Sequence, residues 1–179
     1  SGPIKMYLNG DLGLNNGVNK HAASALYAVD RYASFKSDWG LDYDKGIVIV
    51  ADRYVGSNAT YQGAKCQNMD ELKVYLSWLQ RFEFVMMGIP VPDITLFLDV
   101  PPNVCNELSK ERANKITNTA VRDILEADRV FQDDVYTTGH IIAREWGWHH
   151  IDCMCGQQIL PIEKIANKIW DFVYPTLRK

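Results

Sequence analysis

The sequence has few of the features that mark a secreted, membrane-spanning or nucleic-acid-binding protein. Its 179 residues include only 4 cysteines, and no apolar run approaches the length of a membrane span. No basic segment followed by an apolar one suggests a secretion leader. The net charge of −3 gives no general attraction to nucleic acid or to an anionic membrane. We therefore expect a cytoplasmic protein that binds neither nucleic acid nor membranes.

The cysteines form neither a disulfide framework nor a metal motif. Cys66 and Cys105 stand alone, and one residue rather than two separates Cys153 from Cys155. The histidines nearest to this pair are at positions 149 and 150, so zinc binding is an alternative to buried or unused thiols. We expect thiols without a metal, in a reducing compartment.

Short apolar runs that alternate with amphipathic segments predict a single α/β domain over residues 1–179. Buried strands are expected over 47–52 and 94–100, and a third strand over 148–153. This alternation indicates a parallel sheet flanked by helices. The opening residues are expected to form a loop around a short apolar turn. Helices are expected over 20–36, 70–87, 124–145 and 161–173.

Helix boundaries and buried faces follow from the same pattern. Asn19 is expected to cap the helix over 20–36, and Asp70 the helix over 70–87. The buried stripe of the first of these helices is expected to consist of Ala22, Leu26, Val29 and Ala33.

An acid and a cation follow the first expected strand directly. Asp52 and Arg53 come after the apolar run Ile47–Ala51, and ligands of parallel sheets bind at the carboxyl ends of strands. A structural ion pair is one interpretation. A phosphate site is the other, because a guanidinium binds phosphate oxygens bidentately and a carboxylate can help to hold hydrated magnesium. Asp99, near the end of the second expected strand, is interpreted as a brace for the turn at Pro101.

Two further groups of residues suit a flat polar ligand. Ser57, Asn58 and Tyr61 could read a base and test a sugar, although a polar helix start would look similar. Tyr27 and Arg31 lie four residues apart and so share one helix face. Such a pair can stack on a ring and donate to its carbonyl oxygens, or it can be a surface cation–π contact.

The polar stretch over residues 109–122 contains several basic residues, among them Arg112. It is either a solvated face or a basic lid that closes over phosphates. Glu126 follows, near the start of the next expected helix.

Together these residues resemble the thymidylate kinase family of P-loop nucleoside monophosphate kinases. The resemblance runs along nearly the whole chain and is strongest in "YAVDRYASF" and "ADRYVGSNATYQGAK". It implies a three-layer P-loop kinase fold, a homodimer, and transfer of the γ-phosphoryl group of ATP to dTMP with Mg²⁺, giving dTDP. Another nucleoside or nucleotide kinase is an alternative.

The resemblance also implies roles for individual residues. Arg53 would contact the phosphates, and Asp52 would act near the metal and the acceptor phosphate. Tyr27 would stack on thymine, where Phe is commoner in the family, and Arg31 would donate to the base. Asn58 would contact the base and Tyr61 would lie near the sugar, and Ser57 would belong to the same substrate-binding loop. Catalytic Arg112 in the lid and metal-binding Glu126 complete the set.

One element of the family pattern is missing from these residues. The donor-phosphate loop G-x-x-x-x-G-K-[ST] does not occur, and neither do the first two strands and first helix that surround it. We expect that these residues are a piece of a longer kinase and that the piece alone does not catalyse the reaction. A shortened domain with a rearranged sheet, strands from a partner chain and a non-catalytic nucleotide-binding or interaction module are the alternatives.

Overall fold

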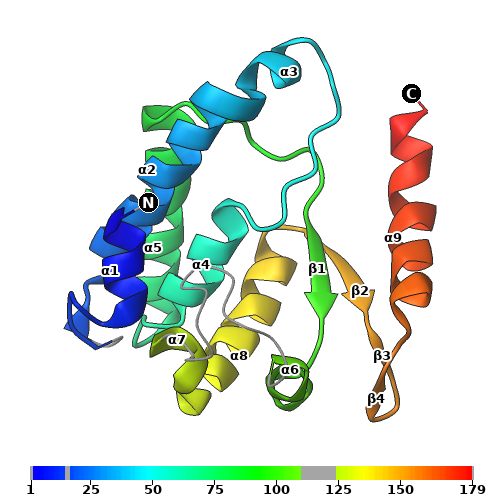
Figure 1. Ribbon diagram of the computed structural model, residues 1–179. Coiled ribbons are helices and arrows are strands. Elements are labelled where there is room, and N and C mark those ends of the chain that lie inside the picture. Colours follow the sequence, from blue (N-terminus) through cyan, green and yellow to red (C-terminus); the bar gives the residue numbers. More distant parts are fainter. Residues whose placement is uncertain (1, 15–16, 110–123, 179) are drawn as a thin grey trace. The chain divides into compact units, whose positions relative to one another are not determined.

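A computed structural model describes residues 2–14, 17–109 and 124–178 of the chain (Figure 1). The chain divides into two compact units, which are described separately. Unit 1 comprises Ser1–Val91 and Ala113–Gly139, and unit 2 comprises Pro92–Arg112 and His140–Lys179. The prediction of a single domain over residues 1–179 stays a prediction.

The described part of unit 1 is helical. Its elements are α1 (Gly2–Asn9), α2 (Lys20–Ser34), the π-helical turn η2 (Phe35–Trp39), α3 (Gly40–Asp44), α4 (Val55–Gly63), α5 (Met69–Gln80), the π-helical turn η3 (Arg81–Met86), α7 (Ile124–Ala127) and the first part of α8 (Arg129–Glu145).

Helix α1 replaces the loop expected for the opening residues. Ile4, Tyr7 and Leu8 are all buried, and their spacing gives one apolar helical face. This face packs in a core cluster with Ala23, Leu125 and Phe131. The Gly- and Asn-rich composition of this segment predicted a loop, but burial of its apolar face stabilises a short helix.

Helix α2 begins as predicted but buries a different face. The Asn19 side chain accepts hydrogen bonds from the backbone N–H groups of His21 and Ala22, at 2.8 and 3.4 Å. The expected apolar stripe is wrong, because Val29 is 59% exposed while the buried residues are Ala23, Ser24 and Ala28. These small side chains let α4 pack closely on this face.

The long helix expected over 70–87 consists of α5 followed by η3. Leu72, Tyr75, Leu76 and Leu79 form its buried apolar face, whereas Met86, on the same helical spacing, is 70% exposed. The predicted cap is wrong: the Asn68 side chain, not that of Asp70, accepts from the Glu71 backbone N–H at 2.9 Å. A cap lies one position before the first helical residue, and the helix begins at Met69.

The buried strand predicted over 47–52 is wrong. Residues 47–51 form no strand, and Ile47, Val48 and Val50 are 50%, 62% and 91% exposed. A strand forms only when its backbone groups pair with a neighbour. No segment among the described residues supplies that neighbour.

Unit 2 contains the small parallel sheet. Strands β1 (Leu96–Asp99) and β2 (His149–Asp152) pair in parallel, with Leu96 opposite His149 and Asp99 opposite Asp152. The second and third predicted strands are therefore confirmed, although Leu98 is 48% exposed. A three-layer arrangement stays a prediction. The remaining elements are α6 (Pro102–Ser109), the end of α8, the hairpin of β3 (Met154–Cys155) and β4 (Gln158–Ile159), and α9 (Ile162–Leu177), which contacts β2.

Candidate functional site

Two predicted base-binding residues meet on a buried carboxylate in unit 1. Arg31 of α2 donates through Nη1 to Glu83 Oε2 at 2.5 Å, and through Nη2 to the Tyr54 backbone oxygen at 3.0 Å. Asn58 of α4 donates through Nδ2 to Glu83 Oε1 at 2.9 Å and to the Ser24 backbone oxygen at 3.0 Å. The network therefore joins α2, α4 and η3.

The network is almost entirely removed from water. Glu83 has no exposed surface, Asn58 is 3% exposed, and the Arg31 side chain is 13% exposed. Burial raises the pKa of the Glu83 carboxyl, whereas the Arg31 cation and the hydrogen bond from Asn58 oppose that shift. The same region is completed by Tyr75, whose hydroxyl donates to the Asn58 backbone oxygen at 3.0 Å.

These hydrogen bonds fix which polar atoms a ligand could use. The Asn58 amide nitrogen already has two acceptors, so the amide carbonyl oxygen is what this side chain can offer to a ligand. Its orientation follows from the hydrogen-bond network. Arg31 can add guanidinium donors beside it. The network thus presents a hydrogen-bond acceptor, the Asn58 amide oxygen, next to the hydrogen-bond donors of the Arg31 guanidinium.

Arg53 has an unusual backbone conformation at the start of α4. Its φ is 70°, and it is the one non-glycine residue with positive φ in the described ranges 2–14, 17–109 and 124–178. This left-handed region costs an L-residue about 1–2 kcal/mol. Strain of this kind clusters at functional sites. The Arg53 guanidinium lies over the Tyr61 ring, 5.5 Å from its centroid.

The remaining described site residues surround α4. Asp52 is exposed and forms no salt bridge within 4.0 Å among the described residues. Against the effect of burial, its charge nevertheless helps to raise the pKa of Arg53, so a structural Asp-Arg pair stays an alternative. Ser57 is half-buried in the first turn of α4. Tyr27 and Tyr61 are also half-buried and pack against the core cluster of Ile4 and its neighbours. The placement of Tyr27 leaves its stacking role a prediction.

Two predicted site residues cannot be placed. Arg112 and most of the expected lid over 109–122 lie outside the described residues. Glu126 belongs to α7, but its side chain is also outside what the structure describes.

Glu83 was not predicted as a site residue, although its position in the sequence indicated a buried carboxylate. Leu72, Leu76 and Leu79 form the buried stripe of α5, and four residues further on that stripe reaches Glu83. A carboxylate at an apolar stripe position requires a buried partner. Arg31 and Asn58 are those partners.

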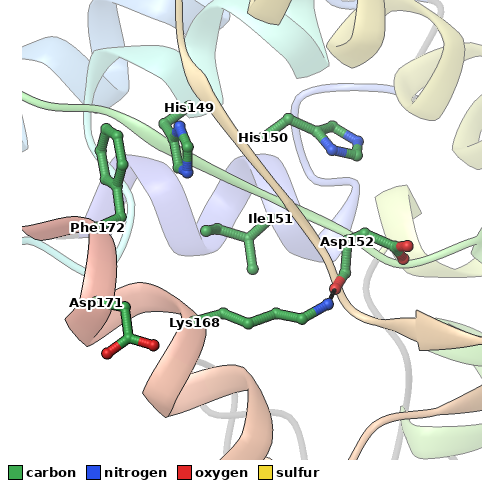
Figure 2. Close-up of a pocket in the computed structure, with 7 residues that line it drawn as sticks. All are labelled: His149, His150, Ile151, Asp152, Lys168, Asp171 and Phe172. Atoms are coloured by element: carbon green, nitrogen blue, oxygen red, sulfur yellow. Dashed lines mark hydrogen bonds between the residues drawn. The ribbon is translucent and has the colours of Figure 1, made fainter.

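Unit 2 has an open hollow of its own, with a volume of about 540 Å³. Figure 2 shows that strand β2 and helix α9 line it, and that Lys168 reaches the Asp152 backbone oxygen, at 2.6 Å. The His149 and Phe172 rings stack with their centroids 3.3 Å apart. None of the predicted site residues whose side chains the structure describes lines this hollow.

The family model for thymidylate kinase matches residues 3–142 of the chain. The chain belongs to the thymidylate kinase family. Membership in this family implies a P-loop kinase fold, of which the described residues show many helices and a small parallel sheet. The matched range includes every site residue proposed from the sequence.

Three curated thymidylate kinases illustrate the similarity. The Mycobacterium tuberculosis protein is 34% identical over 130 residues, which cover 71% of this chain and 58% of that protein. The Thermomicrobium roseum protein is 29% identical over 138 residues, covering 76% and 58%. The Caenorhabditis elegans protein is 29% identical over 123 residues, covering 66% and 50%. The chain therefore matches between 50% and 58% of the length of these relatives.

None of the described helices combines the length and the apolar character needed to cross a membrane.

We predict that Arg31→Ala lowers the free energy of unfolding by about 3–5 kcal/mol at neutral pH, because the Glu83 carboxylate loses its buried counterion. Without the cation, burial raises the folded-state pKa of Glu83 further above its unfolded value. The folded variant then binds more protons than the unfolded chain, so its stability rises as pH falls toward the ordinary range of a carboxyl. Urea unfolding at several pH values measures this.

The matched control is Arg81→Ala, since Arg81 is exposed in the neighbouring turn η3. It is expected to change stability by no more than about 0.5 kcal/mol. The Arg31→Ala/Glu83→Gln double variant, which leaves no unpaired buried charge, should recover part of the loss. Equal effects of the two single arginine substitutions would contradict the buried network.

Backbone strain at Arg53 predicts that Arg53→Gly is more stable than Arg53→Ala by up to about 1 kcal/mol, because glycine adopts φ of 70° without a Cβ clash. The same pair at Ser57, inside helix α4, should show the opposite order by about 1 kcal/mol. Denaturant unfolding of all four variants makes the comparison. An alanine variant at position 53 that is more stable than the glycine variant would exclude the strain.

Proposed function

We propose that the protein to which these residues belong is a thymidylate kinase that transfers the γ-phosphoryl group of ATP to dTMP. Family membership supports this proposal, as does the curated name of each similar protein described above. The observation that carries it is the buried network of Arg31, Asn58 and Glu83.

The network suits the imide edge of thymine. Thymine offers an N3–H donor flanked by carbonyl acceptors, and the network offers an amide oxygen beside guanidinium donors. Cytosine reverses the pattern at N3 and at position 4, so it would place acceptor against acceptor and donor against donor. A buried polar mismatch of this kind gives strong discrimination.

Arg53 would act on the phosphates rather than on the base. Its guanidinium lies over the Tyr61 ring, and the exposed Asp52 precedes Arg53 directly in the chain. A planar fork can bind two phosphate oxygens and stabilise the charge that shifts in the transition state. Its role is therefore expected in the rate constant rather than in binding.

Asp52 has the donor chemistry that Mg²⁺ prefers. It is an exposed carboxylate, and magnesium binds through one or two carboxylates together with waters and substrate phosphates. When bound, the ion neutralises phosphate charge. Asp52 and Glu126 would hold it, and Arg112 in the lid over 109–122 would close on the phosphates.

The donor side of the reaction requires residues beyond these 179. The sequence contains no G-x-x-x-x-G-K-[ST], so we propose that the chain alone does not turn over ATP. Exposed Ile47, Val48 and Val50 support a further strand that pairs with this segment in the complete kinase. A phosphate loop upstream in the encoding reading frame would support this; its absence there would favour a non-catalytic nucleotide-binding module.

We also propose a homodimer. Exposed apolar residues on α2, α5 and η3 support it, with Val29, Val74 and Val85 exposed by 59%, 70% and 74%. Sedimentation that shows a monomer at all concentrations would exclude it.

In a kinase that combines these residues with the phosphate loop, Arg53→Ala should lower kcat by about 100-fold or more with little change in KM for dTMP. Arg53→Lys should not restore kcat, because an ammonium lacks the fork. Asn58→Ala should instead raise KM for dTMP. Steady-state kinetics with dTMP and dCMP, on preparations whose folding is checked by thermal unfolding, measure each effect.

Two outcomes would contradict the proposed function. Equal kcat/KM for dTMP and dCMP would show that the network does not read the imide edge. A folded Arg53→Ala enzyme with an unchanged kcat would make Arg53 a structural residue.

A further inference from the structure

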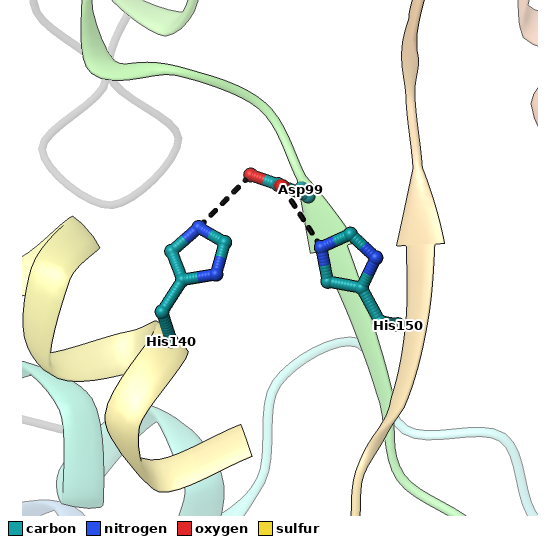
Figure 3. Close-up of side chains that lie close together, drawn as sticks. All are labelled: Asp99, His140 and His150. Carbon is teal, nitrogen blue, oxygen red and sulfur yellow. Dashed lines mark hydrogen bonds and ion pairs between the residues drawn. The ribbon is translucent and has the colours of Figure 1, made fainter. Parts of the chain in front are cut away.

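Three potential metal ligands converge in unit 2, and the family resemblance assigns a role to none of the three. Asp99 ends strand β1, His150 lies on β2, and His140 lies on α8. The Asp99 Oδ2 atom is 2.8 Å from His150 Nε2, and the Oδ1 atom is 3.3 Å from His140 Nε2. Figure 3 shows the two imidazole rings on either side of the carboxylate.

We propose that Asp99, His140 and His150 bind a divalent transition-metal ion, with Zn²⁺ as its representative. One ligand atom from each residue lies within 4.8 Å of the others. Zinc binds imidazole nitrogen and carboxylate oxygen at about 2.0–2.2 Å, which places neighbouring ligand atoms of a tetrahedral site about 3.3 Å apart. Rotation of the two imidazoles toward one ion would close the site.

The chemistry of these three ligands favours a different ion from the magnesium that takes part in phosphoryl transfer. Two imidazoles and one carboxylate suit zinc, cobalt or nickel, whereas Mg²⁺ prefers oxygen ligands and retains its waters. Three protein ligands also leave a fourth position for water. The proposal therefore does not depend on the proposed kinase function.

The surroundings of the three ligands let a metal ion enter from solvent and limit the conformations of the two imidazole rings. The side chains of His140 and His150 are 37% and 46% exposed, so an ion can reach both from solvent. Phe97 contacts both rings, with centroid distances of 5.1 Å to His140 and 6.0 Å to His150. Such packing reduces the rotamer freedom that metal binding would otherwise have to remove.

Binding would stabilise unit 2 because the three ligands come from three elements. A two-stranded sheet is marginal by itself. An ion held by β1, β2 and α8 would join both strands to the helix, and its binding free energy would add to the stability of the folded state.

The test uses the 179-residue chain, freed of any affinity tag and treated with a chelator. Zn²⁺ affinity is measured by competition with a chromogenic chelator, and Mg²⁺ in excess is expected not to displace zinc. His140→Gln and His150→Gln should each weaken Zn²⁺ binding at least about tenfold, since even outer-shell changes cost about 10–100-fold. Zn²⁺ should raise the melting temperature of the wild type but not of the double variant.

The matched control is His149→Gln, which removes the adjacent histidine from β2 but leaves the three ligands in place. Its Zn²⁺ affinity should equal that of the wild type. Co²⁺ substitution of the wild type gives a readout that needs no variant, because nitrogen and oxygen ligands give d–d bands without a thiolate charge-transfer band.

Three results would overturn the proposal. The first is a wild-type Zn²⁺ affinity no tighter than that of the His140→Gln/His150→Gln double variant. The second is a Co²⁺–thiolate charge-transfer band, which would place the ion on cysteines such as Cys155. The third is a loss of Zn²⁺ affinity in the His149→Gln control as large as that in the single His140 and His150 variants.

Discussion

The buried carboxylate of Glu83 is the constraint on which the rest of unit 1 depends. It has no exposed surface, and it receives hydrogen bonds from Arg31 of α2 and Asn58 of α4. A buried charge is tolerated only with such partners. Helices α2 and α4 must therefore keep a fixed distance and rotation relative to η3, and the small residues on the buried face of α2 make that approach possible.

The same constraint orders the proposed substrate site. A guanidinium held by a carboxylate cannot swing freely, and an amide whose nitrogen has two acceptors presents its oxygen in a fixed direction. Selection of the base would then be built into the packing of the helices. Arg53 lies outside this network, in a strained backbone conformation just before α4, and would bind the phosphates.

The helices and strands could be predicted from the sequence better than the contacts between them. Local signals placed α2 with its cap at Asn19, the helix that begins with α5, and strands β1 and β2. The prediction of a strand over 47–52 was wrong because strand formation depends on pairing with another segment, which no local sequence pattern reveals. Arg31 and Asn58 were each assigned to the base, but Glu83, which both contact, was not predicted. The contact of Asp99 with two histidines was not predicted either, because segments distant in the chain create both groups.

The most direct test of the account is an NMR titration of the isotope-labelled chain with dTMP and, separately, with dCMP. The account predicts that dTMP shifts the Arg31 side-chain and Asn58 amide signals, while dCMP at the same concentration leaves both unchanged. Binding of dTMP that shifts other signals but neither of these would contradict the claim that the Glu83 network reads the base.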